Sequence, residues 1–333
     1  MKSICYIVPY FGTLPKNFPL WLMSCKYNPT VNWIIYTDDK TEYDYPDNVK
    51  VNYMSFDELK EQFAQHFDFD IYLDNGWKLC DFRPAYGELF ATDLAGYDFW
   101  GYCDCDLMFG DIRKFYTDEI LDTYDKVAFF GHSTLYRNSE KINSLYKTIL
   151  DTQPSYIDVM SKPKDRTFAF DELGMENIFN ELEIPFFKEI NFANLTKYET
   201  KFHLDLMPKE DEYKNKYQVF TWDNGKILRH YLHNGKINTE EYVYIHFWCR
   251  PMSYKVTDFN KGRYLIYSDV VTDKDFELTP KLIRQKGRSH PIAFYAKSLW
   301  KNRHKLTPER IIFNIKGSLN KGRDNYERSD KYN

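Results

Sequence analysis

The chain has 333 residues, of which 43% are apolar and 28% are charged, so it can bury a large core and is expected to fold. The net charge is −4, and 28 Tyr, 26 Phe and 7 Trp make 18% of the chain aromatic. No stretch approaches the roughly 20 apolar residues of a membrane-spanning helix, and no signal-peptide pattern is found. These features argue against an integral membrane protein, and we expect a cytoplasmic location.

Short apolar strands alternate with helical segments through the first half of the chain, which predicts an α/β sheet covered by helices on both faces. The spacing of Ser55 and Glu58 matches a capping box, so a helix should begin there and run to about His66. The other expected early elements are strands at 4–8, 33–37 and 49–54 and a helix at 20–27.

An apolar strand near residue 100 leads into two acidic residues. Residues 98–103 form an apolar run too short for a helix, so we predict a buried strand. Asp104 and Asp106 follow directly, and the preceding helix is expected from Pro84 to Gly96. Because open α/β sheets bind ligands at the carboxyl ends of their strands, the two carboxylates should lie in the ligand crevice.

The second half of the chain predicts helices, hairpins and one last strong strand. The turn sequences Asp223-Asn224-Gly225 and His233-Asn234-Gly235 favour β-hairpins between residues 200 and 240. After about residue 256 the pattern weakens, so we expect a main domain at 1–255 and a mostly helical extension at 256–333. The remaining expected elements are strands at 127–130 and 242–248 and helices at 138–150 and 171–182.

Asp104 and Asp106 are candidate metal ligands. In a strand-to-loop transition residues i and i+2 point the same way, so both carboxylates can reach one divalent cation. The apolar residues on both sides of the motif argue against a solvated acidic loop. Mg²⁺ or Mn²⁺ held in this way usually takes its other ligands from water and substrate phosphates.

With this motif the sequence resembles the GT-A class of glycosyltransferases, in which a hydrophobic strand ends in a D-x-D that holds Mn²⁺ against the donor diphosphate. Further segments look like a mostly uncharacterised family of bacterial polysaccharide glycosyltransferases. The resemblance covers roughly residues 1–255 and implies a GT-A-like, single Rossmann-type mixed sheet flanked by helices. Its segments are 9–12, W-x-x-Y-T-D at 33–38, 78–84 and 244–247.

The resemblance also implies residues that bind a UDP-sugar donor. Tyr10 and Phe11 would lie near the nucleotide base, and Asp38 would accept a hydrogen bond from the base or the ribose. The alternative for Asp38 is a turn-forming role. Arg250 would reach the diphosphate and stabilise the leaving group.

Three charged residues stand before the expected helix at 84–96. Lys78 and Arg83 would offset phosphate charge, and Asp81 would bind sugar hydroxyls. The alternative is an exposed, salt-bridged helix start. His246, in an apolar strand, is the implied third metal ligand, since imidazole binds Mn²⁺ well; the alternative is a buried core histidine.

The acidic pair Asp171 and Glu172 is the candidate source of a general base. An inverting transfer needs a base for the acceptor hydroxyl, and this pair opens a predicted helix after an aromatic stretch. Asp171 can instead be a helix N-cap, with Glu172 stabilising the first turn. The sequence leaves open which of the two carboxylates is the base.

The expected function is transfer of a hexose-type sugar from a UDP-sugar to a glycan or lipid-linked glycan in bacterial surface polysaccharide synthesis. One alternative is a carbohydrate-binding protein of the same fold without turnover. Another is an aspartate-nucleophile phosphatase, although that class carries its D-x-D on the first strand. In this chain the motif follows about the fourth strand and continues into Leu107 and Met108.

The C-terminal region is strongly basic. Residues 281–333 hold 14 Lys or Arg against 4 Asp or Glu, a net charge of +10, whereas the rest of the chain carries −14. Such a segment suits an anionic membrane surface, so we expect peripheral attachment to the inner face of the membrane. The alternative is a solvated tail. No nucleic-acid-binding motif accompanies it, and no nucleic-acid partner is expected.

Overall fold

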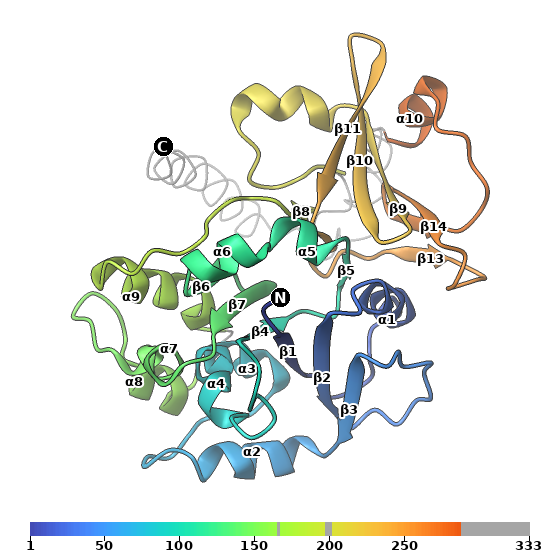
Figure 1. Cartoon of the computed structure of the whole chain (residues 1–333). Helices are drawn as coiled ribbons and strands as arrows, with labels where there is room; N and C mark the ends of the chain where they lie inside the picture. Colours follow the sequence, from blue (N-terminus) through green and yellow to red (C-terminus); the bar gives the residue numbers. More distant parts are fainter. Residues whose placement is uncertain (165–166, 197–201, 288–333) are drawn as a thin grey trace, which may run out of the picture. The chain divides into compact units, whose positions relative to one another are not determined.

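The computed structural model describes residues 1–164, 167–196 and 202–287. A six-stranded central sheet has the order β3-β2-β1-β4-β7-β6 (Figure 1). Strands β1, β2, β3 and β4 pair in parallel with one another, and β7 pairs antiparallel with both β4 and β6. The mixed α/β fold class is therefore confirmed. The strands are β1 (Ile4–Pro9), β2 (Val31–Thr37), β3 (Val49–Tyr53), β4 (Phe99–Cys103), β6 (Lys126–Phe130) and β7 (Ser133–Arg137).

Both faces of the central sheet are covered, because alternate residues of each strand point to opposite sides. In β1, Cys5 and Ile7 pack into one buried cluster and Tyr6 and Val8 into the other. The first cluster takes residues from α2, α3, α4, α7 and α9, and the second from α1, α5 and α6. These helices are α1 (Phe18–Lys26), α2 (Phe56–Ala64), α3 (Leu79–Phe82), α4 (Tyr86–Leu89), α5 (Ile112–Phe115), α6 (Asp118–Thr123), α7 (Glu140–Asn143) and α9 (Met175–Glu181).

The capping box at α2 is confirmed. The Ser55 side chain accepts a hydrogen bond from the Glu58 backbone N–H, and the Glu58 carboxylate accepts one from the Ser55 N–H. These contacts satisfy two amides that a helix start would otherwise leave unpaired. Leu59 and Phe63 then face the core.

The single helix expected at 84–96 is replaced by a series of short turns. The turns η2 (Arg83–Ala85) and α4 overlap the expected range and end at Leu89, and η1 (Gly76–Lys78) and α3 precede them. Pro84 has no N–H to donate and its ring restricts the preceding turn, so the chain tightens into a 3₁₀ turn there. The helix expected at 138–150 is also shorter, since it contains α7 and the 3₁₀ turn η3 (Leu145–Lys147). Two further helical segments are α8 (Tyr156–Ser161) and the π-helical turn η4 (Phe170–Gly174).

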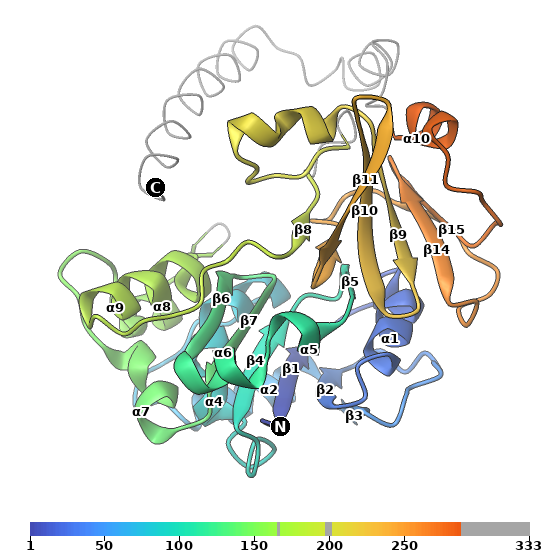
Figure 2. The same ribbon diagram turned by 45° about the horizontal axis from the view of Figure 1, so that its top comes forward.

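A second six-stranded sheet contains the predicted hairpins and has the order β11-β10-β9-β14-β15-β13 (Figure 2). Asn224 and Gly225 have φ of 45° and 85°, and Asn234 and Gly235 have φ of 50° and 76°; two consecutive positive φ values are typical of the type I′ hairpin turn. The strands are β9 (Gln218–Asp223), β10 (Lys226–His233), β11 (Lys236–Tyr242), β13 (Ser253–Lys255), β14 (Arg263–Tyr267) and β15 (Val270–Thr272).

This sheet continues beyond residue 255, because β14 pairs with β9 and β15 pairs with β14. Helix α10 (Pro280–Lys286) follows, and a compact unit spans Met1–Arg288. A 3₁₀ segment, η5 (Lys209–Asn215), precedes the sheet. The rest of the expected helical extension, residues 288–333, lies outside the described residues. None of the described helices is both long and apolar enough to cross a bilayer.

A small third sheet joins distant parts of the chain next to the D-x-D motif. Its order is β5-β12-β8, from β5 (Leu107–Phe109), β12 (Tyr244–His246) and β8 (Ala193–Asn194). Met108 and Ile245 lie in one buried cluster with residues of the second sheet, including Phe220 and Trp222. The small sheet thereby connects the carboxyl end of β4 to the second sheet.

Candidate active site

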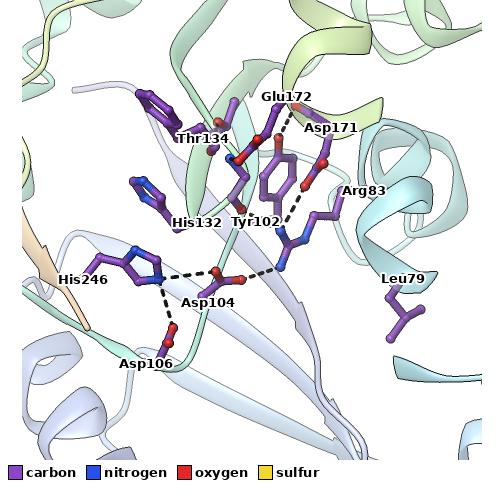
Figure 3. A network of polar contacts seen from close by, with 12 residues as sticks. Leu79, Arg83, Tyr102, Asp104, Asp106, His132, Thr134, Asp171, Glu172 and His246 are labelled. Atoms are coloured by element: carbon purple, nitrogen blue, oxygen red, sulfur yellow. Dashed lines mark hydrogen bonds and ion pairs between the residues drawn. The ribbon is translucent and has the colours of Figure 1, made fainter. Parts of the chain in front are cut away.

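The two acidic residues after β4 lie beside His246. The Nε2 atom of His246 is 3.2 Å from Asp106 Oδ1 and 3.8 Å from Asp104 Oδ2 (Figure 3). One ligand atom from each of the three residues falls within 4.8 Å of the others. The antiparallel pairing of His246 with Leu107 explains this approach, since it places β12 directly alongside the motif.

Backbone hydrogen bonds hold the loop at 104–106 in place. The Asp104 N–H donates to the His132 carbonyl at 3.0 Å, and the Phe247 N–H donates to the Asp106 carbonyl at 2.9 Å. Side chains of the α1 region donate to the other carbonyls: Trp21 Nε1 to Asp104 at 3.2 Å and Asn17 Nδ2 to Cys105 at 2.6 Å. The loop is therefore anchored through its backbone from three sides, and none of these four contacts uses a carboxylate oxygen.

His246 is oriented for ligation by its second ring nitrogen. The side chain is buried, and its Nδ1 lies 2.8 Å from Asn194 Oδ1. An amide oxygen only accepts, so Nδ1 carries a proton and Nε2 is the ring nitrogen that faces the carboxylates. Burial lowers the pKa of His246, but Asp106 and then Asp104 outweigh this effect and raise the pKa above its usual value. The His132 ring stacks on it with centroids 4.4 Å apart.

The three side chains fit a hard divalent cation such as Mn²⁺ or Mg²⁺, since two carboxylates and one imidazole are suitable ligands and leave positions for phosphate oxygens. Asp106 is partly preorganised, because the Cys249 N–H donates to its Oδ2 at 2.6 Å. Trp248 and Cys249 have φ of 47° and 51°, a left-handed conformation that is costly outside glycine. This strained turn presents the Cys249 amide to the carboxylate.

His246→Ala separates the ligand role from the core role. We expect Mn²⁺ affinity to fall about 100-fold or more, because loss of an outer-shell partner alone costs about 10- to 100-fold, with only a small change in melting temperature. Titration calorimetry with Mn²⁺ and thermal melts on the same samples measure both quantities. A lower melting temperature with unchanged Mn²⁺ affinity would assign His246 to the core instead.

Arg83 connects this cluster to the acidic pair. Its guanidinium donates through Nη2 to Asp104 Oδ1 and through Nη1 to Asp171 Oδ2 at 3.0 Å. Nη1 also donates to the Gly131 carbonyl at 2.6 Å. The structure thus brings Arg83 and Asp171 to the candidate metal cluster, and Glu172 follows Asp171 on the π-helical turn η4.

Gly131 allows the acidic pair to approach the sheet. Its N–H donates to Glu172 Oε1 at 2.8 Å. A Cβ at this position would lie 2.8 Å from Asp171 Oδ2 and 2.9 Å from Glu172 Oε1, closer than atoms normally pack. Burial raises the pKa of Asp171 to about 7, against the lowering effect of Arg83 and with a further contribution from Glu172. Such a value suits proton transfer near neutral pH.

The residues expected around the nucleotide lie in the loop after β1 and at the end of β2. Tyr10 is partly buried, and its pKa is raised by burial and then by Cys105 and Asp106. Phe11 packs on the Phe56 ring at 5.3 Å. Asp38 is exposed and accepts a hydrogen bond from the Gly12 N–H at 2.7 Å, a contact that shapes this loop.

Lys78 and Asp81 form a buried ion pair. Lys78 Nζ donates to Asp81 Oδ2 at 2.9 Å and to the Val159 carbonyl at 2.6 Å. The other oxygen of Asp81 accepts from the Phe168 N–H at 2.8 Å. Both side chains are at most 1% exposed, so they join three chain segments instead of forming an exposed helix start.

Lys78→Met should destabilise the protein by about 3–5 kcal/mol, because it leaves the Asp81 carboxylate buried without its partner. Denaturant unfolding measures this loss. The double variant Lys78→Met/Asp81→Leu should recover most of it, since no uncompensated charge remains. A single variant as stable as the parent protein would contradict this account of the pair.

Arg250 is also buried, and its described contacts are with carbonyls. Its Nε donates to Ser268 O at 3.2 Å and its Nη1 to Thr196 O at 2.8 Å. The guanidinium carbon lies 5.8 Å from the Phe202 ring centre. These contacts join the segment after β12 to two neighbouring segments.

Three residues that sequence reasoning missed support the cluster: Gly131, His132 and Asn194. His132 Nδ1 lies 2.9 Å from the Tyr244 hydroxyl, which locks the ring that stacks on His246. Gly131 and His132 form the tight connection between β6 and β7, and Asn194 lies on the two-residue strand β8. None of the three belongs to a recognisable motif. A glycine between two strand patterns was the one available signal.

Among solved structures, the chain is similar to mouse xyloside xylosyltransferase 1 in its apo form, with 11% identity, a TM-score of 0.38, and coverage of 76% of this chain and 99% of that one. It is similar to an active-site mutant of LgtC, with 12% identity, a TM-score of 0.37, and coverage of 75% and 88%. The galactosyltransferase LgtC in complex with donor and acceptor sugar analogues gives 11% identity, a TM-score of 0.37, and coverage of 75% and 89%.

The search of curated proteins found no match. A family model described as a family of unknown function, DUF6625, matches residues 6–275. This range contains the three residues of the candidate metal cluster, the acidic pair and all strands except the first two residues of β1. Since the match covers most of the sequence, the chain belongs to the DUF6625 family.

Proposed function

We propose that this protein is a metal-dependent glycosyltransferase that uses a nucleotide-sugar donor. The observation that carries the proposal is the cluster of Asp104, Asp106 and His246 at the carboxyl end of a central strand. Arg83 connects the cluster to the buried carboxylate of Asp171. A metal site next to a carboxylate with a pKa near neutrality is suited to transfer a group from a diphosphate leaving group to a hydroxyl.

Asp104, Asp106 and His246 would hold Mn²⁺ or Mg²⁺. The bound cation would neutralise the charge that develops on the leaving nucleotide diphosphate. Asp171 or Glu172 would accept the proton of the acceptor hydroxyl. Tyr10, Phe11 and Asp38 would form the nucleotide side of the site, and we take the donor to be a UDP-hexose.

A panel of nucleotide sugars tests this function. Melting temperature and sugar hydrolysis are measured for each nucleotide sugar with Mn²⁺ and with a chelator. We expect UDP-sugars to stabilise the protein and to be hydrolysed slowly only when Mn²⁺ is present. Metal-independent binding of glycans, with no hydrolysis of any nucleotide sugar, would instead indicate a carbohydrate-binding protein without turnover.

We further propose that the acceptor is a glycan or lipid-linked glycan of bacterial surface polysaccharide synthesis, presented at the inner face of the membrane. Support comes from the +10 charge of residues 281–333. Segments 292–300 and 311–315 supply apolar residues among the Lys and Arg of this region, a composition typical of segments that lie on an anionic bilayer.

Full-length protein should therefore sediment with anionic vesicles at low salt and be released at high salt. Each basic residue near such a surface contributes about 1 kcal/mol, and the attraction falls off within a Debye length. A chain truncated after residue 287 should remain in the supernatant, and neutral vesicles serve as the control. Full-length protein that ignores anionic vesicles at low salt would favour a soluble acceptor.

A further inference from the structure

Arg83 holds one oxygen of a candidate metal ligand and one oxygen of a buried carboxylate at the same time. Nη2 donates to Asp104 Oδ1, and Nη1 donates to Asp171 Oδ2 at 3.0 Å. The guanidinium carbon lies 5.0 Å from the centre of the Tyr102 ring, and 14% of the side chain is exposed. Packing and hydrogen bonds therefore hold the guanidinium between the two carboxylates. Loss of the contact with one carboxylate would change the contact with the other.

In the cluster, one oxygen of each aspartate already accepts a hydrogen bond from the protein. Asp104 Oδ1 accepts from Arg83, and Asp106 Oδ2 accepts from the Cys249 N–H. The remaining oxygens, Asp104 Oδ2 and Asp106 Oδ1, face His246 Nε2. A cation at the cluster would thus take one oxygen from each aspartate, and Arg83 would remain the positive neighbour of Asp104.

Asp171 relies on the same guanidinium. Its side chain is 5% exposed, and the Tyr102 hydroxyl donates to its backbone carbonyl at 3.0 Å. In the described part of the chain, the ion pair of the Asp171 carboxylate is the one with Arg83. Glu172 and Asp104 add negative charge nearby. Two carboxylates therefore share one hydrogen-bonded cation.

We propose that Arg83 is a positioning residue that couples the metal cluster to Asp171, so that the charge of Asp171 changes the affinity of the cluster for a divalent cation. This inference rests on the proposed metal-dependent function. While Asp171 is charged, Arg83 divides its attraction between two carboxylates. If the Asp171 charge is removed, Arg83 pairs with Asp104 alone and opposes a cation there more strongly. Coupling between binding free energies is reciprocal, so cation binding would change the free energy of the Asp171 charge by the same amount.

A double-mutant cycle on the full chain tests the coupling. Mn²⁺ affinity is measured by titration calorimetry and by the electron paramagnetic resonance signal of free Mn²⁺, without nucleotide, at pH 8. We expect Asp171→Asn to weaken Mn²⁺ binding about fivefold when Arg83 is present. In an Arg83→Gln background the same substitution should change the affinity by less than about 1.5-fold. Glu119→Gln, at an exposed position on α6, controls for the loss of one negative charge.

Arg83→Lys sharpens the test, because an ammonium group is a single point charge and lacks the planar fork that holds two carboxylates. Its cycle with Asp171→Asn should resemble that of Arg83→Gln. An equal effect of Asp171→Asn in all three backgrounds would overturn the coupling while leaving the metal site intact. Absence of Mn²⁺ binding in the unmodified protein would overturn the proposed function and the coupling together.

Discussion

Asp106→Ala is expected to abolish the dependence of UDP binding on Mn²⁺ while the protein stays folded. Asp106 supplies one of the two carboxylate oxygens that face His246 Nε2, at 3.2 Å. Loss of an outer-shell partner of a metal site typically costs about 10- to 100-fold in affinity or activity. Removal of a direct ligand should therefore cost about 100-fold or more in sugar transfer. The Cys249 amide would also lose its acceptor.

Calorimetry of UDP binding with Mn²⁺ and with chelator measures this effect. In the unmodified protein the two affinities should differ strongly, and in Asp106→Ala they should be the same. Asp70→Ala, at an exposed carboxylate, is the matched control and should behave like the unmodified protein. Equal UDP affinity with and without metal in the unmodified protein would rule out a metal-held diphosphate.

Asp171→Asn should reduce transfer to the acceptor by about 10² to 10⁴-fold, the usual contribution of a general base. The accompanying loss of UDP and Mn²⁺ affinity should be much smaller. Burial raises the pKa of Asp171 to about 7. A base acts in its deprotonated form, so transfer by the unmodified protein should rise as the pH passes upward through about 7. The asparagine variant should lose this rise.

Stability should change in the opposite direction over the same pH range. The folded-state pKa of Asp171 lies above the ordinary value of an aspartate, so its protonated form favours folding at low pH. This contribution is lost as the pH rises from about 4 through about 7. Asp171→Asn should therefore be less sensitive to pH in denaturant unfolding between these values.

Glu172→Gln distinguishes the two members of the acidic pair. Glu172 is partly exposed and its Oε1 accepts from the Gly131 N–H, so we expect a smaller loss of transfer than for Asp171→Asn. If Glu172→Gln abolishes transfer and Asp171→Asn does not, Glu172 is the base. Unchanged transfer in both variants would remove the pair from the catalytic site.

Local patterns were sufficient for five of the six strands of the central sheet and for both hairpin turns. The apolar run of β4, the capping box at Ser55 and the Asn-Gly turns depend on residues within a few positions of one another, so they can be read directly from the sequence. Strand β7 was missed, although it lies between β4 and β6 in the central sheet. Only Gly131 and His132 separate the end of β6 from the start of β7. The apolar pattern of this stretch therefore does not show that two strands are present.

The candidate site likewise contains residues that the sequence located and residues that only the tertiary structure brought together. The sequence by itself placed Asp104 and Asp106 at a strand end, because strand position and spacing follow from local pattern. The tertiary structure decided which other polar residues join them. Arg83 reaches the cluster, whereas Lys78 and Asp81 pair with each other in the interior.

These three charged residues are within six positions of one another, and their sequence context is alike. Whether each side chain is buried in the interior or reaches the cluster depends on what packs against it. The segments at Val159 and Phe168 enclose Lys78 and Asp81. Burial of a charge is tolerated only where a partner compensates it. That partner comes from elsewhere in the fold, so its identity is a property of the packed molecule and not of the local sequence.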